Sequence, residues 1–169
     1  QIGDPKFIDG LKRVADADAV MDTANPTLDL LEAMIRINDK IPSLRIVIDH
    51  LPQLDPDDEK AYAVLLREIH GRPKINAKLS EIDHRSMKAR GLAAHKARLD
   101  QLMEAFGEDR VVFGTDWPNS WGTATPAEIV AIARAYFATR TREAAEKYFW
   151  KNSLAVYKWK KRAANQPSL

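Results

Sequence analysis

Two apolar runs with the composition of buried strands lead to residues that could perform acid–base or metal chemistry. Residues 110–113 lead to Asp116, and residues 45–48 lead to His50. In an α/β protein, the carboxyl ends of parallel strands are where ligands and catalytic groups are placed. A carboxylate there can accept a proton from water or hold a metal ion, and an imidazole can bind a metal, polarise a carbonyl group or transfer a proton. We therefore take Asp116 and His50 as candidate catalytic residues, and Asp116 also as a candidate metal ligand.

Both residues also have a structural interpretation. Asp116 could cap the turn at residues 117–118, and His50 could be a hydrogen-bonded packing residue. Because side chains alternate along a strand, Asp116 is expected to share a face with Gly114, whose small size leaves room for a ligand. By the same alternation, His50 shares a face with the isoleucines before it. Asp49 is then expected to point towards the covering helices.

A third run, residues 74–80, has one polar face. Asn76, Lys78 and Ser80 alternate with apolar residues, so they are expected on the same side of the strand. Near the rim of a barrel, Lys78 could bind a substrate carboxylate or pair with Asp116, and Ser80 could contact the substrate. Alternatively, the strand lies at a sheet edge and Lys78 reaches water.

Two tryptophans flank the end of the 110–113 run. Trp117 and Trp121 could form the wall of an apolar or aromatic substrate pocket, or could cover the rim as part of the core. Asp22, at the end of an earlier and shorter strand-like run, is a weaker candidate of the same kind. His84, in the polar loop at residues 81–88, is the other histidine expected near the rim.

Composition and motifs exclude several classes of site. The absence of cysteine excludes disulfides and thiolate metal centres, so a metal would need histidine and carboxylate ligands. Neither His-x-His nor His-Glu-x-x-His occurs, so a self-contained zinc centre is not expected. Gly-x-Ser-x-Gly, Gly-x-Gly-x-x-Gly and Walker motifs are missing too.

The overall charge and hydropathy pattern argue against nucleic-acid and membrane partners, and a small-molecule substrate is expected instead. The net charge of +2 and the lack of a basic, aromatic-interleaved stripe argue against a nucleic-acid partner. No apolar run approaches the roughly 20 residues of a membrane span. Without a signal-like start, the expected location is the cytoplasm.

The elements that must position these residues alternate between strand and helix. Strands are expected at residues 18–23, 45–49, 74–80 and 110–116, with helices between and after them; Asn152 or Ser153 is expected to cap the last helix. The strand spacing is long enough for right-handed crossovers between parallel strands. The prediction is an α/β fold of barrel-type βα units, in one domain over residues 1–169 with a frayed tail at 160–169. Four strands make either an open sheet or part of a larger barrel, since a closed barrel needs eight.

Three segments resemble the amidohydrolase-related family of metal-dependent TIM-barrel hydrolases, lactonases and decarboxylases. They are Ile-Val-Ile-Asp-His at 46–50, Ala-Lys-Leu-Ser at 77–80, and the stretch from 106 that ends in Gly-Thr-Asp-Trp-Pro at 114–118. Their order and spacing resemble the last four strands of that barrel. The residues around Asn152, Leu154 and Tyr157 resemble its closing helix. The resemblance therefore implies the C-terminal half of a TIM barrel.

The resemblance also implies roles for individual residues. Asp116 matches the final-strand aspartate that binds metal or activates water, and His50 matches the sixth-strand histidine that orients or polarises the substrate. Lys78 and Ser80 match a recurrent strand pattern. However, the segment that matches the family's fifth strand reads Met-Asp-Thr-Ala at 21–24, without the histidine ligand that ends this strand in metal-binding members. The His-x-His pair of the family's first strand has no counterpart in this sequence. A divalent ion, Zn or Mn, and metal-free catalysis are both compatible with this pattern.

Two functions follow. In the first, the chain is part of an enzyme that hydrolyses a lactone, ester or amide of a small organic acid. Asp116 is then the base, and His50 polarises the carbonyl group. Decarboxylation of a cyclic or aromatic acid is the related alternative. In the second, the chain is a non-catalytic scaffold whose open sheet edges cause it to self-associate as a homo-oligomer.

Overall fold

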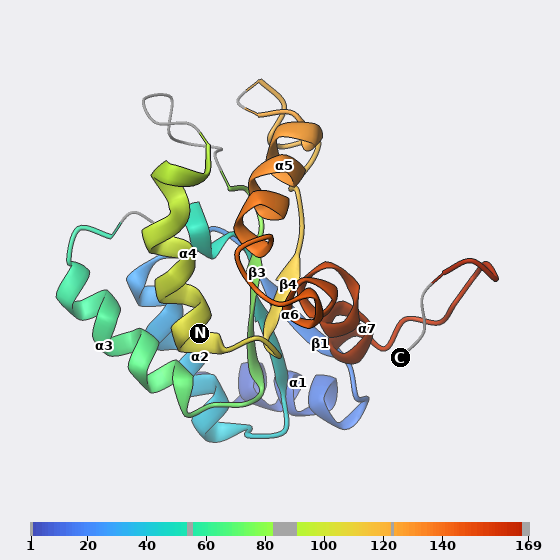
Figure 1. The fold of residues 1–169 in the computed structure, drawn as a ribbon. Helices are drawn as coiled ribbons and strands as arrows, with labels where there is room; N and C mark the ends of the chain where they lie inside the picture. Colours follow the sequence, from blue (N-terminus) through green and yellow to red (C-terminus); the bar gives the residue numbers. More distant parts are fainter. Residues whose placement is uncertain (1, 54–55, 83–90, 123, 167–169) are drawn as a thin grey trace.

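The computed structural model describes residues 2–53, 56–82, 91–122 and 124–166, and these form a parallel sheet covered by helices (Figure 1). The four strands lie in the order β1-β2-β3-β4, so each is hydrogen-bonded to the next along the chain. Their bounds are β1 Val20–Thr23, β2 Arg45–Ile48, β3 Ile75–Leu79 and β4 Val111–Phe113. Consecutive parallel strands joined by helices confirm the predicted α/β fold and are the arrangement of half a (β/α)8 barrel.

Helices begin where the sequence places capping residues. The bounds are α1 Pro5–Asp16, α2 Leu28–Lys40, η1 Leu51–Gln53, α3 Glu59–His70, α4 Leu92–Phe106 and α5 Pro126–Phe137. Asp4, Thr27 and Asp58 each accept a backbone N–H of the first turn that follows. Thr125 and Glu128 form a reciprocal capping box at the start of α5. None of the helices in the described part of the chain is long and apolar enough to cross a membrane.

The C-terminal helical segment differs from the expectation of a separately capped last helix. α6 (Arg142–Glu146) continues through a π-helical turn, η2 (Lys147–Lys151), into α7 (Asn152–Tyr157) without a side-chain cap at Asn152. The Asn152 amide instead donates to the carbonyls of Glu108 and Val111, both at 2.7 Å. This side chain therefore ties the segment to the start of β4.

The two faces of the sheet pack differently. Ile46, Ile48, Ile75, Ala77 and Leu79 are fully buried in the main core, which α2, α3 and α4 cover. The opposite face, called the inner face below, is smaller: Val47 and Val112 pack there against Val156 of α7. Figure 1 shows α3 and α4 on one side of the sheet and α7 on the other. The alternation predicted for β3 is confirmed, since its apolar residues all lie in the main core.

Arg110 secures the end of the sheet where the strands begin. Its guanidinium group donates to six carbonyl oxygens, at 2.9 to 3.1 Å; they belong to Ile69, His70, Arg72, Ile75, Ala105 and Phe106. Four of these carbonyls are in the last turns of α3 and α4, where the helix dipole favours a cation. Burial lowers the pKa of Arg110 from its ordinary value. This residue therefore anchors two helix ends and the start of β3 together.

Candidate active site at the carboxyl ends of the strands

Three adjacent strands are followed by residues with left-handed backbone conformation. His50, Glu81 and Asp116 have φ values of 60°, 56° and 59° and follow β2, β3 and β4, respectively. This conformation costs a residue with a Cβ atom about 1–2 kcal/mol. Histidine and aspartate adopt it more readily than most residues do, whereas glutamate has no such preference. Strain repeated at three neighbouring strand ends indicates a functional site.

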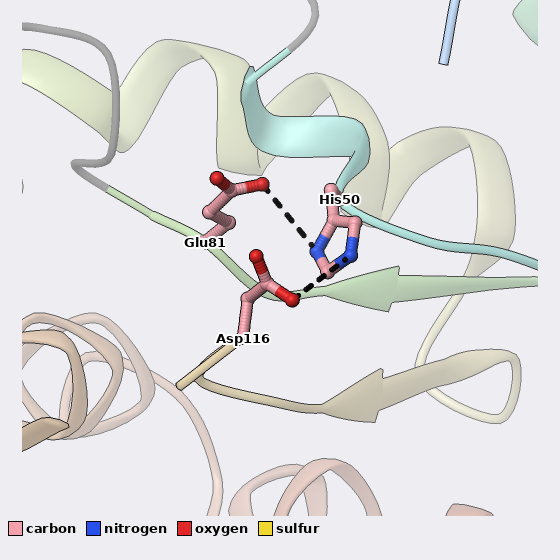
Figure 2. A group of neighbouring side chains, drawn as sticks. All are labelled: His50, Glu81 and Asp116. Carbon is pink, nitrogen blue, oxygen red and sulfur yellow. Dashed lines mark ion pairs between the residues drawn. The ribbon is translucent and has the colours of Figure 1, made fainter. Parts of the chain in front are cut away.

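The three side chains converge (Figure 2). Nε2 of His50 lies 3.4 Å from Oδ1 of Asp116, and Nδ1 lies 3.6 Å from Oε2 of Glu81. Oγ of Ser80 lies 2.8 Å from the same Nδ1. The side chains of His50, Glu81 and Asp116 are only 12, 6 and 15% exposed, so their electrostatic interactions are less screened than at the surface. The structure thus brings together the two predicted catalytic residues and adds Glu81.

Asp116 does not use its carboxylate to cap the backbone of the following turn. Its Oδ1 atom accepts a hydrogen bond from Nδ2 of Asn119 at 3.3 Å and also faces His50. The turn is instead held by Thr115, whose Oγ1 accepts the Trp117 N–H, and by the Asp116 carbonyl, which accepts the Ser120 N–H. The carboxylate therefore remains directed towards the imidazole.

The expected orientation of Asp49 is wrong. Its Oδ1 atom lies 2.8 Å from Nζ of Lys78 on the inner face, rather than among the helices. Val47 also lies on the inner face, so Asp49 follows the alternation along β2; the expectation failed because Ile46 and Ile48, the isoleucines assigned to the face of His50, lie in the main core. The left-handed conformation of His50 then redirects the chain.

Lys78 is held in a polar cluster on the inner face. Its Nζ atom pairs with Asp49 at 2.8 Å and with Asp22 at 3.2 Å, and the Tyr157 hydroxyl donates to Asp22 at 2.6 Å. Burial by itself lowers the pKa of Lys78, but the two carboxylates outweigh burial, so the net pKa is raised and the lysine stays charged. Among the described residues, its ion pairs are with Asp22 and Asp49, not with Asp116.

Gly114 is required where β3 and β4 approach each other. A Cβ atom at this position would lie 2.9 Å from Cβ of Ser80 and 3.1 Å from Cδ of Lys78. The first distance is shorter than real Cβ contacts, so a larger residue would displace its neighbours. Gly114 thus lies beside the Lys78 and Ser80 side chains and indirectly fixes the serine that contacts His50.

The other predicted residues lie around this site. Trp117 and Trp121 are 54 and 77% exposed, so they are available to a ligand rather than buried as core. Ser80 is fully buried and contacts His50. His84 lies outside the described residues.

Glu81 was missed by the sequence analysis because it was assigned to the polar loop after β3. A usable signal existed: Glu81 follows Leu79, the end of β3, by two residues, just as His50 follows Ile48, the end of β2. Acid–base residues at equal offsets from neighbouring parallel strands reach the same edge of the sheet.

The donor set suits a divalent cation. One ligand atom from each of His50, Glu81 and Asp116 can be chosen so that all lie within 4.8 Å of one another. Ligand atoms about 2.1 Å from a tetrahedral zinc ion are separated by about 3.4 Å, which is the distance between His50 Nε2 and Asp116 Oδ1. The contact of Ser80 with Nδ1 matches the way that metal-binding imidazoles are held through their other nitrogen.

Known proteins share this fold and parts of this sequence. The amidohydrolase family model matches residues 3–159. An L-fucono-1,5-lactonase from Burkholderia multivorans is 30% identical over 122 residues, which are 65% of this chain and 41% of the lactonase. A crystal structure of an amidohydrolase from Burkholderia multivorans with bound zinc superposes with a TM-score of 0.80 at 22% identity, over 93% of this chain and 58% of that one.

A third similar protein, amidohydrolase 2 from Bifidobacterium longum subsp. infantis, has a TM-score of 0.73 at 20% identity over 93% of this chain and 57% of its own. The chain thus spans about half the length of the proteins it matches. The predicted similarity to half of a barrel is confirmed by these superpositions. Because the family model matches nearly all of the described fold, this chain belongs to the amidohydrolase family.

Proposed function

We propose that this chain provides the His50–Asp116 part of an active site that hydrolyses a lactone of a small organic acid. The observation that carries the proposal is the imidazole and carboxylate pair, 3.4 Å apart and largely buried, beyond the carboxyl ends of β2 and β4 in one parallel sheet. The lactonase from Burkholderia multivorans supports the choice of substrate class.

In the proposed reaction, the Asp116 carboxylate takes a proton from the attacking water as the water oxygen bonds to the lactone carbonyl carbon. The ring C–O bond then breaks, and the leaving oxygen receives the proton that Asp116 took from the water, which gives the hydroxy acid and restores the carboxylate. His50 Nε2 faces the same point, where it can bind a cation or, when protonated, donate to the carbonyl oxygen. Asn119 keeps the carboxylate in place through its hydrogen bond to Oδ1.

His50 and Asp116, with Glu81 beside them, are the residues that would hold a divalent ion. Such an ion would polarise the substrate carbonyl group and lower the pKa of bound water. The zinc in the structurally similar amidohydrolase supports this assignment. Catalytic zinc sites generally have three protein ligands, and these three residues each offer one ligand atom within 4.8 Å of the other two.

The solvent exposure and ion pairs of the side chains near Asp116 indicate which of them can contact a substrate. Trp117 and Trp121 are large, exposed and within five residues of Asp116, so we propose that they pack against the apolar part of the substrate. Lys78 could attract a substrate carboxylate only by exchanging one of its present partners, Asp22 or Asp49. Ser80 supports the site through His50.

The test is hydrolysis of a panel of sugar lactones by the full-length gene product, with and without chelator, Zn²⁺ or Mn²⁺. Asp116→Asn is expected to reduce kcat/KM by at least about 100-fold, the usual contribution of a general base. Glu104→Gln, an exposed residue of α4, is the control and should leave kcat/KM unchanged. Hydrolysis retained by Asp116→Asn would refute the assigned base. Release of CO2 from carboxylated aromatic acids without lactone hydrolysis would show a decarboxylase instead.

A further inference from the structure

Asn25 follows β1 as His50 follows β2 and as Glu81 follows β3. Each lies two positions beyond the last residue of its strand and has a left-handed backbone, with φ of 55° in Asn25. Along a regular strand, a residue at this position would share the face of the strand's last residue, and Ile48 and Leu79 lie in the main core. In His50 and Glu81, the side chain instead points into the site. The same offset and conformation indicate that Asn25 also turns towards this rim of the sheet.

The register of the sheet places Asn25 beside His50. Thr23, the last residue of β1, pairs with Ile48, the last residue of β2. The Asp49 N–H donates to the Thr23 carbonyl at 2.8 Å, so the two chains are still hydrogen-bonded beyond the end of β2. Neighbouring strands are about 4.8 Å apart. We therefore expect a molecule bound at the His50 imidazole to lie within reach of the Asn25 side chain.

Local turn chemistry explains only part of the conformation of Asn25. Asparagine adopts left-handed φ more readily than most residues do. However, Asn25 precedes Pro26, and a residue before proline is normally extended. Asn25 is also exposed, it is Thr27 that caps α2, and within the described part of the chain the Asn25 amide has no hydrogen-bond partner. Its donors and acceptor are therefore available to a ligand.

The chemistry of an amide suits recognition rather than catalysis. The Asn25 side chain does not ionise, so it cannot act as the acid or base that His50 and Asp116 provide. Its oxygen accepts hydrogen bonds and its NH2 group donates them, and a hydroxyl group can form either bond in return. An unsubstituted lactone ring has acceptor oxygens alone. An amide at this rim therefore favours a ring that carries hydroxyl groups.

We propose that Asn25 is a specificity-determining residue that hydrogen-bonds a hydroxyl group of the substrate, so that the site prefers hydroxylated lactones to unsubstituted ones. This inference rests on the proposed function and narrows its substrate class. Asn25 recognises the substituted part of the ring, whereas His50 and Asp116 act on the carbonyl group.

The first experiment compares kcat/KM of the full-length gene product for a sugar 1,5-lactone and for δ-valerolactone, the six-membered lactone without hydroxyl groups. In Asn25→Gly, we expect kcat/KM for the sugar lactone to fall by about 3- to 10-fold, the usual value of one hydrogen bond, and kcat/KM for δ-valerolactone to stay unchanged. Glycine adopts left-handed φ readily, so this variant removes the side chain without straining the backbone. Equal losses for both lactones, as a merely structural role would give, or no loss for either, would overturn the proposal.

Asp18→Gly is the matched control. Asp18 also has left-handed φ, 53°, but it precedes β1 and so lies at the opposite end of this strand. The variant should leave the ratio of the two kcat/KM values unchanged. A change in this ratio as large as that in Asn25→Gly would show an effect of chain conformation rather than of recognition, and would also overturn the proposal.

Ligand binding provides a readout without catalysis. The side-chain amide ¹H–¹⁵N signals of Asn25 are assigned by their loss in Asn25→Gly and are then followed in Asp116→Asn, which is expected to leave the lactone intact. Titration with the sugar lactone should shift these signals. Binding that shifts the indole signals of Trp117 and Trp121 but leaves the Asn25 amide unmoved would contradict the assignment. If the unsubstituted enzyme hydrolyses no lactone, the proposed function fails, whereas a shift of the Asn25 signals would still show recognition of a hydroxylated ring.

Discussion

The two ends of the sheet use polar side chains in opposite ways. Where the strands begin, Arg110 and Asn152 direct their donors at backbone carbonyls of α3, α4, β3 and the start of β4. Where the strands end, His50, Glu81 and Asp116 face one another, and all three have left-handed backbone conformation. The first end satisfies main-chain groups and so stabilises the fold. At the second end, the polar side chains face one another instead of main-chain groups, as the catalytic groups of an active site do.

The largest effect on stability is expected from Arg110→Met. This change removes the donors for six carbonyl oxygens, some of which are buried and would have to find water. We expect a loss of about 3 kcal/mol in the free energy of unfolding, measured by urea denaturation, because each unsatisfied buried group costs about 1–3 kcal/mol and water compensates in part. The environment of His50 in the remaining folded molecules should not change.

Arg134→Met, on the exposed side of α5, is the control and should change stability by less than about 0.5 kcal/mol. If Arg110→Met were as stable as this control, the contrast between a stabilising end and a functional end would be wrong.

Gly114→Ala is expected to disturb both stability and the site. The new Cβ atom would lie 2.9 Å from Cβ of Ser80 and force β3 and β4 apart, at a cost of about 2 kcal/mol. Because Ser80 contacts His50, the NMR signals of the imidazole should shift as well. Gly10→Ala is the matched control: it lies within α1 with nothing within 4 Å of the added methyl group, and it should stabilise the helix by about 0.5–1 kcal/mol.

The smallest of these effects is expected from Lys78→Met, which leaves Asp22 and Asp49 without their shared cation. We expect a destabilisation of about 1–2 kcal/mol, between the values for exposed and buried pairs, since the lysine is 22% exposed. The pKa of Lys78 is raised in the folded chain. Its stabilising contribution is therefore fully present below the unfolded pKa of about 10.4 and is lost as pH rises through the folded value.

Denaturation of both proteins from pH 7 to 11 checks this prediction. The stability difference should stay constant up to about pH 10 and then decrease. A difference that disappears near pH 8 would show that the Lys78 cluster does not contribute as described. Lys40→Met, at the exposed end of α2, is the control.

The elements of the fold could be predicted because each has a local cause. Apolar runs mark the four strands, and α1, α2 and α5 begin directly after Asp4, Thr27 and Thr125, residue types whose side chains cap a helix. Tertiary contacts override such signals elsewhere. Asn152 was expected as a cap, but its amide reaches the carbonyls of Glu108 and Val111 instead.

The site was only partly predictable, because its geometry depends on backbone conformations that the residue types do not reveal. His50 and Asp116 were found from their positions after apolar runs. Glu81 was not found because it was assigned to an ordinary loop. Asp49 was oriented wrongly because the isoleucines of β2, rather than Val47, were assigned to the face of the site. Left-handed backbone conformation is usually predicted from a glycine or asparagine in the sequence, whereas the three positions here hold histidine, glutamate and aspartate.

The central claim is that His50 and Asp116 act as one unit, and a double-variant cycle on kcat/KM for lactone hydrolysis tests it most directly. Residues that act as a unit are strongly non-additive. We therefore predict that His50→Gln and Asp116→Asn each reduce kcat/KM by at least about 100-fold, and that the double variant is no worse than the poorer single variant. Losses that multiply in the double variant, or hydrolysis that survives either substitution, would contradict the account.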